Sequence, residues 1–211
     1  MNRYNAKQND VVSARITALI LGSPRLRQQL LPEGPLISPY EILDYRSILV
    51  LKDQKGAEAV FQRTQRVRFL QDGVEAILDS FWGDGVLLTA YRHSAGAIAD
   101  SFKDEGRRHL VIALPRRMRR GEVLTFTVSR TVMEGFTGRH QLLETVIDHP
   151  LGRLDIAIRA PQTRRFEQVE MQVGTGPKAI FVASAPPGGT LARIYIPRAR
   201  SHTRYALRWR W

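Results

Sequence analysis

Apolar and polar residues alternate along most of this chain, and the alternation is clearest between residues 107 and 132. In the second half of that stretch, one set of alternate positions is apolar and the other carries hydroxyl groups: Leu124, Phe126 and Val128 against Thr125, Thr127 and Ser129. A period of two indicates a strand with one buried face. We therefore interpret residues 107–132 as two strands joined by a turn at 116–120, and we expect a mainly β protein.

Comparable stretches follow one another along the chain, separated by turn residues. We expect strands at 47–52, 57–70, 86–92, 141–148, 154–159, 167–173, 178–184, 191–196 and 204–211. Residues 74–82 fit either a strand or a short amphipathic helix, and residues 94–106 fit a loop, the longest in the chain. Many short strands with closely spaced turns are typical of sandwiches and barrels. We predict an antiparallel β-sandwich.

The first 42 residues have a different pattern. Apolar residues fall at helical spacing between residues 11 and 21, and Asp10 is a suitable N-cap for that helix. A second short helix fits residues 24–31, after which prolines indicate an extended connector. We predict a helical leader and Pro-rich connector at 1–42 and a β-sandwich domain at 43–211. The leader is either a cap on one open end of the sandwich, which we favour, or a docking arm.

The last predicted strand separates aromatic from basic residues. One face carries Tyr205, Leu207, Trp209 and Trp211, and the other carries Arg204, Arg208 and Arg210. An aromatic face most often packs into the core, because each ring buries a large area. The alternative is base stacking on an exposed sheet, as in proteins that bind single-stranded nucleic acids. We predict that the aromatic face is core and that the arginine face is open to solvent or to a partner.

Positive charge changes the picture more than any other property of the composition. The net charge is +12 and the isoelectric point is near 10.8, which favours anionic partners. Four arginines, Arg116, Arg117, Arg119 and Arg120, lie within the predicted turn. Four like charges so close repel one another, so folding gives no reason to collect them. We expect these four, with Arg204, Arg208 and Arg210, to bind an acidic protein; nucleic acid is the second hypothesis, and a solvated turn is the alternative without function.

Several kinds of chemistry have no motif in this sequence. There is no cysteine, no HExxH pair, no phosphate-binding glycine loop and no GxSxG elbow. We therefore expect no metal, no cofactor and no catalysis, with an enzyme as the third hypothesis. The N-terminus lacks the layout of a secretory signal, and the longest apolar cluster, 16–21, is too short to span a bilayer. We expect a soluble, cytoplasmic protein that does not insert into membranes.

Four segments carry a resemblance to a known class of proteins. They are Tyr40-Glu41-Ile42-Leu43, Gln65-Arg66-Val67-Arg68-Phe69, Phe81-Trp82-Gly83-Asp84-Gly85 and the closing Tyr205-Ala206-Leu207-Arg208-Trp209-Arg210-Trp211. Over roughly residues 40–211 the chain resembles uncharacterised bacterial β-rich proteins that accompany signalling or protease effectors of conflict and defence systems. The shared motifs are structural, so the resemblance implies no active-site residue. It implies an accessory or regulatory role, as a target or inhibitor of an effector.

Overall fold

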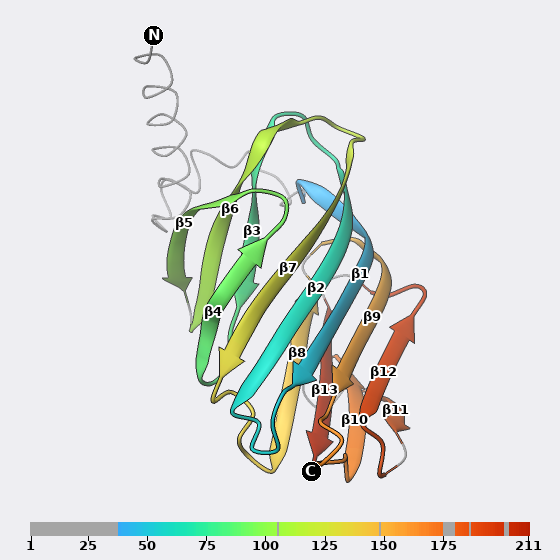
Figure 1. Cartoon of the computed structure of the whole chain (residues 1–211). Helices are drawn as coiled ribbons and strands as arrows, with labels where there is room; N and C mark the ends of the chain where they lie inside the picture. Colours follow the sequence, from blue (N-terminus) through green and yellow to red (C-terminus); the bar gives the residue numbers. More distant parts are fainter. Residues whose placement is uncertain (1–37, 105, 148, 175–179, 186, 201–202) are drawn as a thin grey trace.

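Every regular element that the structure describes is a β-strand. The structure is a computed structural model, and it describes residues 38–211 except 105, 148, 175–179, 186 and 201–202 (Figure 1). The prediction of a mainly β protein is confirmed for this part of the chain. The helices predicted at 11–21 and 24–31, and most of the predicted leader, lie outside the described residues. The first strand begins at Tyr40 rather than after residue 42.

The strands form three sheets. Their bounds are β1 Tyr40–Leu51, β2 Glu58–Phe69, β3 Val74–Phe81, β4 Val86–His93, β5 Ala97–Asp104, β6 Arg107–Met118, β7 Val123–Met133, β8 His140–Ile147, β9 Leu151–Arg159, β10 Gln168–Val173, β11 Ile180–Ala185, β12 Leu191–Ile196 and β13 Thr203–Arg210. A six-stranded sheet has the order β12-β9-β1-β2-β7-β4, a four-stranded sheet β11-β10-β13-β8, and a three-stranded sheet β3-β6-β5. The two smaller sheets lie behind the six-stranded sheet in the view of Figure 1.

The six-stranded sheet is mixed, not purely antiparallel. Strands β1 and β2 form a hairpin, and the Asp53 carboxylate holds its turn by accepting the backbone N–H groups of Lys55, Ala57 and Glu58. Strand β9, however, runs parallel to β1. The described strand pairs are otherwise antiparallel, so the predicted antiparallel arrangement holds for the other pairs and not for this one. A parallel pair needs a long crossover, and nearly a hundred residues, β2 to β8, separate these two strands.

Strands β6 and β7 are consecutive but do not form the hairpin that their sequence suggests. Strand β6 lies between β3 and β5 in the three-stranded sheet, and β7 lies between β2 and β4 in the six-stranded sheet. Both edges of each strand are already paired, so the turn between them carries the chain from one sheet to another. The two strands and the turn predicted for residues 107–132 are therefore present, but the two strands belong to different sheets and do not pair with each other.

One further segment differs from the prediction, and the structure decides between the two alternatives for another. Residues 94–106, expected to be a loop, contain β5, which pairs antiparallel with β6. The register shifts between Ile98 and Asp100, and such a bulge disrupts the alternation by which a strand is recognised. Residues 74–82 are a strand and not a helix, because β3 pairs along the other edge of β6.

One hydrophobic core joins the three sheets. It includes Leu49 of β1, Ile112 of β6 and Trp209 of β13, each at most 3% exposed. The predicted aromatic face of the last strand is buried throughout: Tyr205, Leu207, Trp209 and Trp211. The core interpretation is confirmed, and the rings are not available for base stacking.

Candidate functional site

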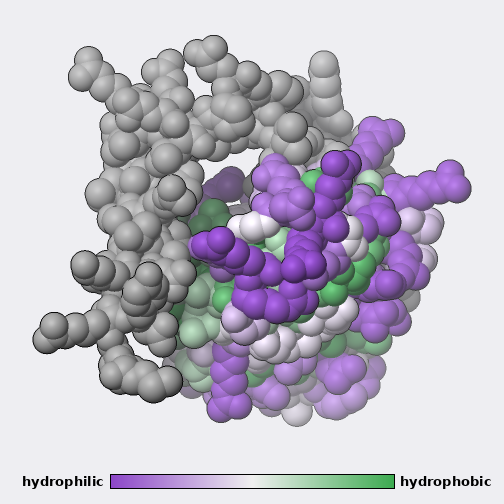
Figure 2. Space-filling view, turned by 90° about the horizontal axis from the view of Figure 1, so that it is seen from above, coloured by the Kyte–Doolittle hydropathy of each residue, from purple (hydrophilic) through white to green (hydrophobic). Residues whose placement is uncertain are grey.

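The arginine turn, residues 116–120, lies at one end of the molecule. It is at the top in Figure 1 and faces the viewer in Figure 2, where hydrophilic side chains gather at this end. The turn rests against the β2–β3 connection, since Gly121 N–H donates to the Phe69 carbonyl and Gly73 N–H donates to the Met118 carbonyl. All four arginines of the turn are exposed, while Met118 between them is buried.

Carboxylates divide the four arginines into two pairs. Arg116 forms an ion pair of 2.8 Å with Glu122, and Arg117 forms one with Glu75. For the other two, carboxylates bind the backbone instead: Glu122 accepts the Arg119 N–H at 3.1 Å, and Asp72 accepts the Arg120 N–H at 2.9 Å. The guanidinium groups of Arg119 and Arg120 form no hydrogen bond or ion pair with any other described residue. The backbone of the turn is therefore held in place while two cations stay unpaired.

Glu122 is the residue that organises this turn. Its carboxylate accepts hydrogen bonds from the Arg119 backbone and from the Arg116 guanidinium, and both lower the pKa of Glu122. The carboxylate therefore stays ionised at any pH near neutrality. Our expectation that like charges repel in this turn is thus only half true, because two of its four charges are neutralised locally.

The C-terminal arginines lie on a different sheet. Arg204 forms an ion pair with Glu144 of β8, and Arg210 forms one of 2.8 Å with Glu167. Arg208 is exposed, lies in register with Glu170 of β10, and makes no ion pair with a described residue. The structure therefore does not unite the seven predicted arginines into one surface, and within its described part three of the seven are unpaired: Arg119, Arg120 and Arg208.

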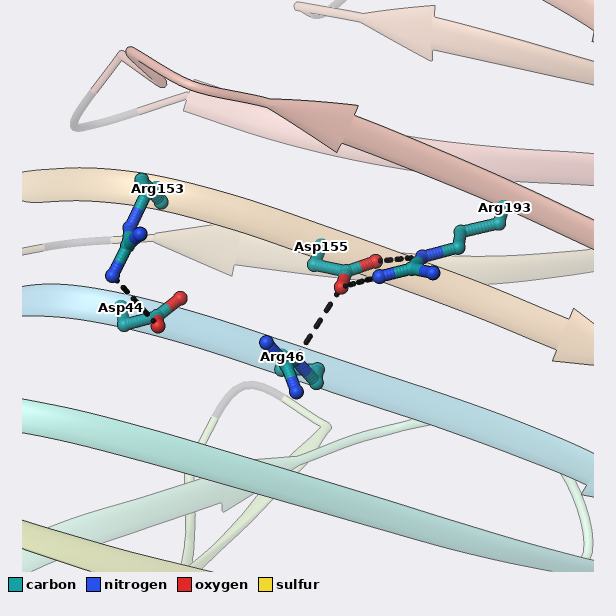
Figure 3. Close-up of polar contacts among 5 residues, drawn as sticks. All are labelled: Asp44, Arg46, Arg153, Asp155 and Arg193. Atoms are coloured by element: carbon teal, nitrogen blue, oxygen red, sulfur yellow. Dashed lines mark hydrogen bonds and ion pairs between the residues drawn. The ribbon is translucent and has the colours of Figure 1, made fainter.

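The outward face of the six-stranded sheet holds an arginine cluster that the sequence did not single out (Figure 3). The Asp155 carboxylate of β9 lies between Arg46 of β1, at 3.4 Å, and Arg193 of β12, at 2.6 Å. A further pair joins Arg153 and Asp44 at 3.1 Å. Asp155 is only 4% exposed, because the two arginines cover it. Three arginines share two aspartates here, so the cluster links the strands across the sheet and keeps a net charge of about one positive unit.

A cleft of about 710 Å³ opens on the opposite, inner face of the same sheet. Its floor is built from β1, β2 and β7, including Leu49, Phe61 and Val128. Its sides are β3 and β8, which are the end strands of the two smaller sheets. The second layer therefore leaves a gap where its two sheets meet, and the gap is of the size that small-molecule sites have.

The floor of the cleft carries a buried charge cluster. Arg63 donates to one oxygen of Asp79 at 2.9 Å, and the Tyr91 hydroxyl donates to the other oxygen at 2.7 Å. Burial by itself would raise the pKa of Asp79, but the charge of Arg63 and the two hydrogen bonds outweigh burial and lower it. Burial and the Asp79 charge together raise the pKa of Tyr91. Asp79 is therefore an anion with both oxygens engaged.

Arg130 is a second cation at the same place. Its guanidinium lies over the rings of Phe61 and Phe81, at 5.0 and 5.1 Å from the centroids, and donates to the Leu87 carbonyl at 3.1 Å. Burial lowers the pKa of Arg130 to about 10, and Asp79 offsets this only in part because Arg63 is also near. Arg130 remains charged at neutral pH. Two arginines thus share one aspartate, and the cluster has a net charge of about one positive unit.

His93 borders this cluster and is half-buried in its neutral form. Its ring stacks on Phe126 at 4.8 Å, and its Nδ1 accepts the Ala95 N–H at 3.1 Å. An accepting Nδ1 carries no proton, so protonation of the ring would break this hydrogen bond. Burial lowers the pKa of His93 from 6.5 to about 4.

We expect His93 to make the fold less stable in mild acid. Between pH 6.5 and about 4 the unfolded chain binds a proton that the folded protein does not, so stability falls as the pH drops through this window. The unfolding free energy should fall by at most roughly 1.4 kcal/mol per pH unit, and by less than this because solvent screens the charge at this half-buried site. Urea unfolding at pH 7, 6, 5 and 4.5 measures this decrease. His93→Phe, which keeps the stack on Phe126, should lose less stability over that range than the wild type; equal losses would contradict the assignment.

Metal chemistry finds no support among the described residues, where no group of three or more His, Cys, Asp or Glu side chains is placed to hold an ion. In the same part of the chain no helix combines the length and the apolar character needed to cross a bilayer.

Comparisons with known proteins do not identify a family for this chain. Neither the protein-family models nor the curated proteins compared with the sequence match it. Among solved structures, a mutant of a two-domain M1 zinc metallopeptidase bound to L-tryptophan has a TM-score of 0.44 and 10% identity, and covers 80% of this chain and 42% of its own. The M1 zinc metallopeptidase from Deinococcus radiodurans has a TM-score of 0.40 and 12% identity over the same shares. The chain thus spans less than half the length of these structures, and the likeness is too low to carry an argument.

Proposed function

We propose that this protein is a non-catalytic binding module that recognises an acidic protein through its arginine turn. The observation that supports this is the pair of exposed, unpaired guanidinium groups of Arg119 and Arg120 on a backbone held by Asp72 and Glu122. Guanidinium groups match carboxylates in a two-pronged geometry. A turn fixed in this way presents them without a large ordering cost on binding.

The other arginines have a subordinate part in this proposal. Arg116 and Arg117 already have carboxylate partners, so an acidic partner would have to displace Glu122 or Glu75 to bind them. Arg208 is available but lies on the four-stranded sheet, on a surface distinct from the turn. The module has a sandwich-like scaffold in this proposal, with the turn at one open end.

We expect the double variant Arg119→Ser/Arg120→Ser to bind its acidic partner at least tenfold more weakly. A hydrogen bond to a charged group contributes about 1.5–3 kcal/mol. Both guanidinium groups are exposed and make no hydrogen bond or ion pair with a described residue, so the free energy of unfolding should change by less than about 0.5 kcal/mol. The measurement is capture of proteins from a nuclease-treated extract with the immobilised full chain, identification of the bound protein, and titration with that purified protein.

A matched control removes the same charge elsewhere. Arg66 of β2 and Arg92 of β4 are exposed and unpaired among the described residues, so Arg66→Ser/Arg92→Ser lowers the net charge equally. This control should bind as the wild type does. If both double variants lose the same affinity, the interaction depends on net charge alone and the turn has no special role.

Nucleic acid is the alternative outcome of the same experiment. It predicts that nuclease treatment removes the bound material, that purified protein carries absorbance at 260 nm until a high-salt wash, and that log K falls with log salt. In the turn variant the slope of log K against log salt should become smaller in magnitude, by about 0.7–0.9 for each phosphate that the variant no longer neutralises. Binding that survives nuclease and shows no affinity for heparin would favour an acidic protein.

The setting of this function is also part of the proposal. On the resemblance to bacterial β-rich proteins, we propose that the partner is an effector of a signalling or protease defence system in the cytoplasm, and that this chain regulates it.

A further inference from the structure

The inner cleft is built differently from the arginine turn, and it suggests a second binding activity. Its buried floor brings together Arg63 and Arg130, which come from neighbouring strands. In the β2–β7 pairing Arg63 is opposite Val128 and Phe61 is opposite Arg130. The two arginines are therefore diagonal neighbours on one face of the sheet, within reach of one shared ligand.

The polar groups of this floor are incompletely satisfied. Asp79 uses both oxygens on Arg63 and Tyr91, and Arg130 uses one nitrogen on the Leu87 carbonyl. The Nε of Arg63 is buried and has no hydrogen-bond partner within the described part of the chain. A buried donor without a partner is costly, and a buried charge without a counterion more so. An anion at this place would satisfy both needs.

The charge of the cluster selects the kind of anion. Two arginines and one aspartate leave about one positive charge, which a monoanion neutralises and a dianionic phosphate exceeds. Around the cluster the lining of the cleft is mixed: it includes charged side chains such as Arg107 and Glu144, and apolar side chains, among them Leu49, Phe61 and Val128 on the floor. At its sides lie Leu78 of β3 and Leu142 of β8, which are 49% and 41% exposed. The apolar side chains of this mixed lining can contact an apolar body beside an acidic head that lies on the arginines.

We propose that the cleft between β3 and β8 binds a small organic monocarboxylate with an apolar body, its carboxylate on Arg63 and Arg130. The charge complementarity of the floor, the unpartnered Nε donor of Arg63, the apolar side chains within the mixed lining and a volume of about 710 Å³ support this assignment. The proposal is independent of the arginine turn, which lies between β6 and β7.

The test compares ligands that differ only in the head group. Octanoate, 1-octanol, octylamine and octyl phosphate are titrated into the full chain by calorimetry. We expect one octanoate per chain, 1-octanol about 10- to 100-fold weaker because it lacks the charge-assisted hydrogen bonds, octyl phosphate weaker than octanoate, and no binding of octylamine. Octanol binding as tightly as octanoate, octyl phosphate binding more tightly, or absence of octanoate binding would each overturn the proposal.

Variants locate the ligand. Arg130→Met keeps an apolar stem between the two phenylalanine rings and should abolish the preference for octanoate over octanol. Arg92→Met, at an exposed position of β4, should leave it unchanged. Leu142→Trp adds bulk at the exposed side of the cleft and should weaken octanoate even if Arg130→Met does not fold. Unaltered octanoate binding in both folded Arg130→Met and Leu142→Trp would place the ligand elsewhere and refute the site.

Discussion

Asp79→Ala should destabilise the protein by about 3–5 kcal/mol, the cost typical of breaking a buried ion pair from one side. Asp79 is 4% exposed and is the anion shared by Arg63 and Arg130. Its removal leaves two buried cations without a counterion and the Tyr91 hydroxyl without its acceptor. Chemical denaturation at pH 7 measures the decrease in unfolding free energy.

Two further variants separate charge from packing at this position. Asp79→Leu/Arg63→Met removes both partners and replaces them with apolar side chains, so it should recover much of the stability that Asp79→Ala loses. Asp84→Ala removes an exposed carboxylate a short distance along the chain and should change stability by less than about 0.5 kcal/mol. A decrease below about 1 kcal/mol in Asp79→Ala, well short of the cost of an uncompensated buried charge, would mean that water reaches the arginines freely.

The unfolding free energy at low pH should also depend on Asp79. Because its folded-state pKa lies below the ordinary value of 3.8, its contribution is complete above that value and is lost as the pH falls through the folded pKa. This window lies below that of His93, which acts between 6.5 and about 4. The contributions of His93 and Asp79 to the unfolding free energy should therefore be lost in two successive pH ranges, that of His93 first.

Alternation predicted most strands well because it reports burial, which is a local property of each strand. It could not predict sheet membership. The turn at 116–120 looks like a hairpin turn, yet β6 and β7 pair with other strands, because pairing depends on which edges are already occupied. The parallel β1–β9 pair has no local signal either, since the two strands meet only after the intervening strands are placed.

The buried charge cluster had a signal in the sequence that our interpretation did not use. Arg63 lies in phase with Phe61 and Val67, Asp79 with Ile77 and Phe81, and Arg130 with Val128 and Val132. A charged residue on the apolar face of a strand must find a partner inside the fold. The phase shows which residues need partners, but their meeting across two sheets follows only from the tertiary structure.

The four arginines of the turn could be found in the sequence, but their ion pairs could not. Their charge density distinguished them from other residues, but it did not show which of them have carboxylate partners. Glu122 and Glu75 neutralise two of them, and Glu75 comes from a strand of the three-stranded sheet. Only the packing of the β6–β7 turn against the β2–β3 connection reveals that Arg119 and Arg120 are the free pair within the described residues.

Trp209→Ala should cost about 3–5 kcal/mol, as expected when a large buried side chain is truncated in a core. The Trp209 ring is 3% exposed and packs against Phe136 at 5.7 Å and edge-on against Trp211 at 6.3 Å. Two control variants test this assignment.

The Trp209 Nε1–H has no hydrogen-bond partner among the residues that the structure describes. Trp209→Phe therefore breaks no hydrogen bond there and should cost much less, below about 1.5 kcal/mol. Tyr195→Ala, at a ring that is 56% exposed, should change stability by under about 0.5 kcal/mol. Urea unfolding of the three variants gives the order Trp209→Ala, Trp209→Phe, Tyr195→Ala. If Trp209→Ala were as stable as the wild type but no longer bound a partner, the aromatic face would be a binding surface, contrary to its burial here.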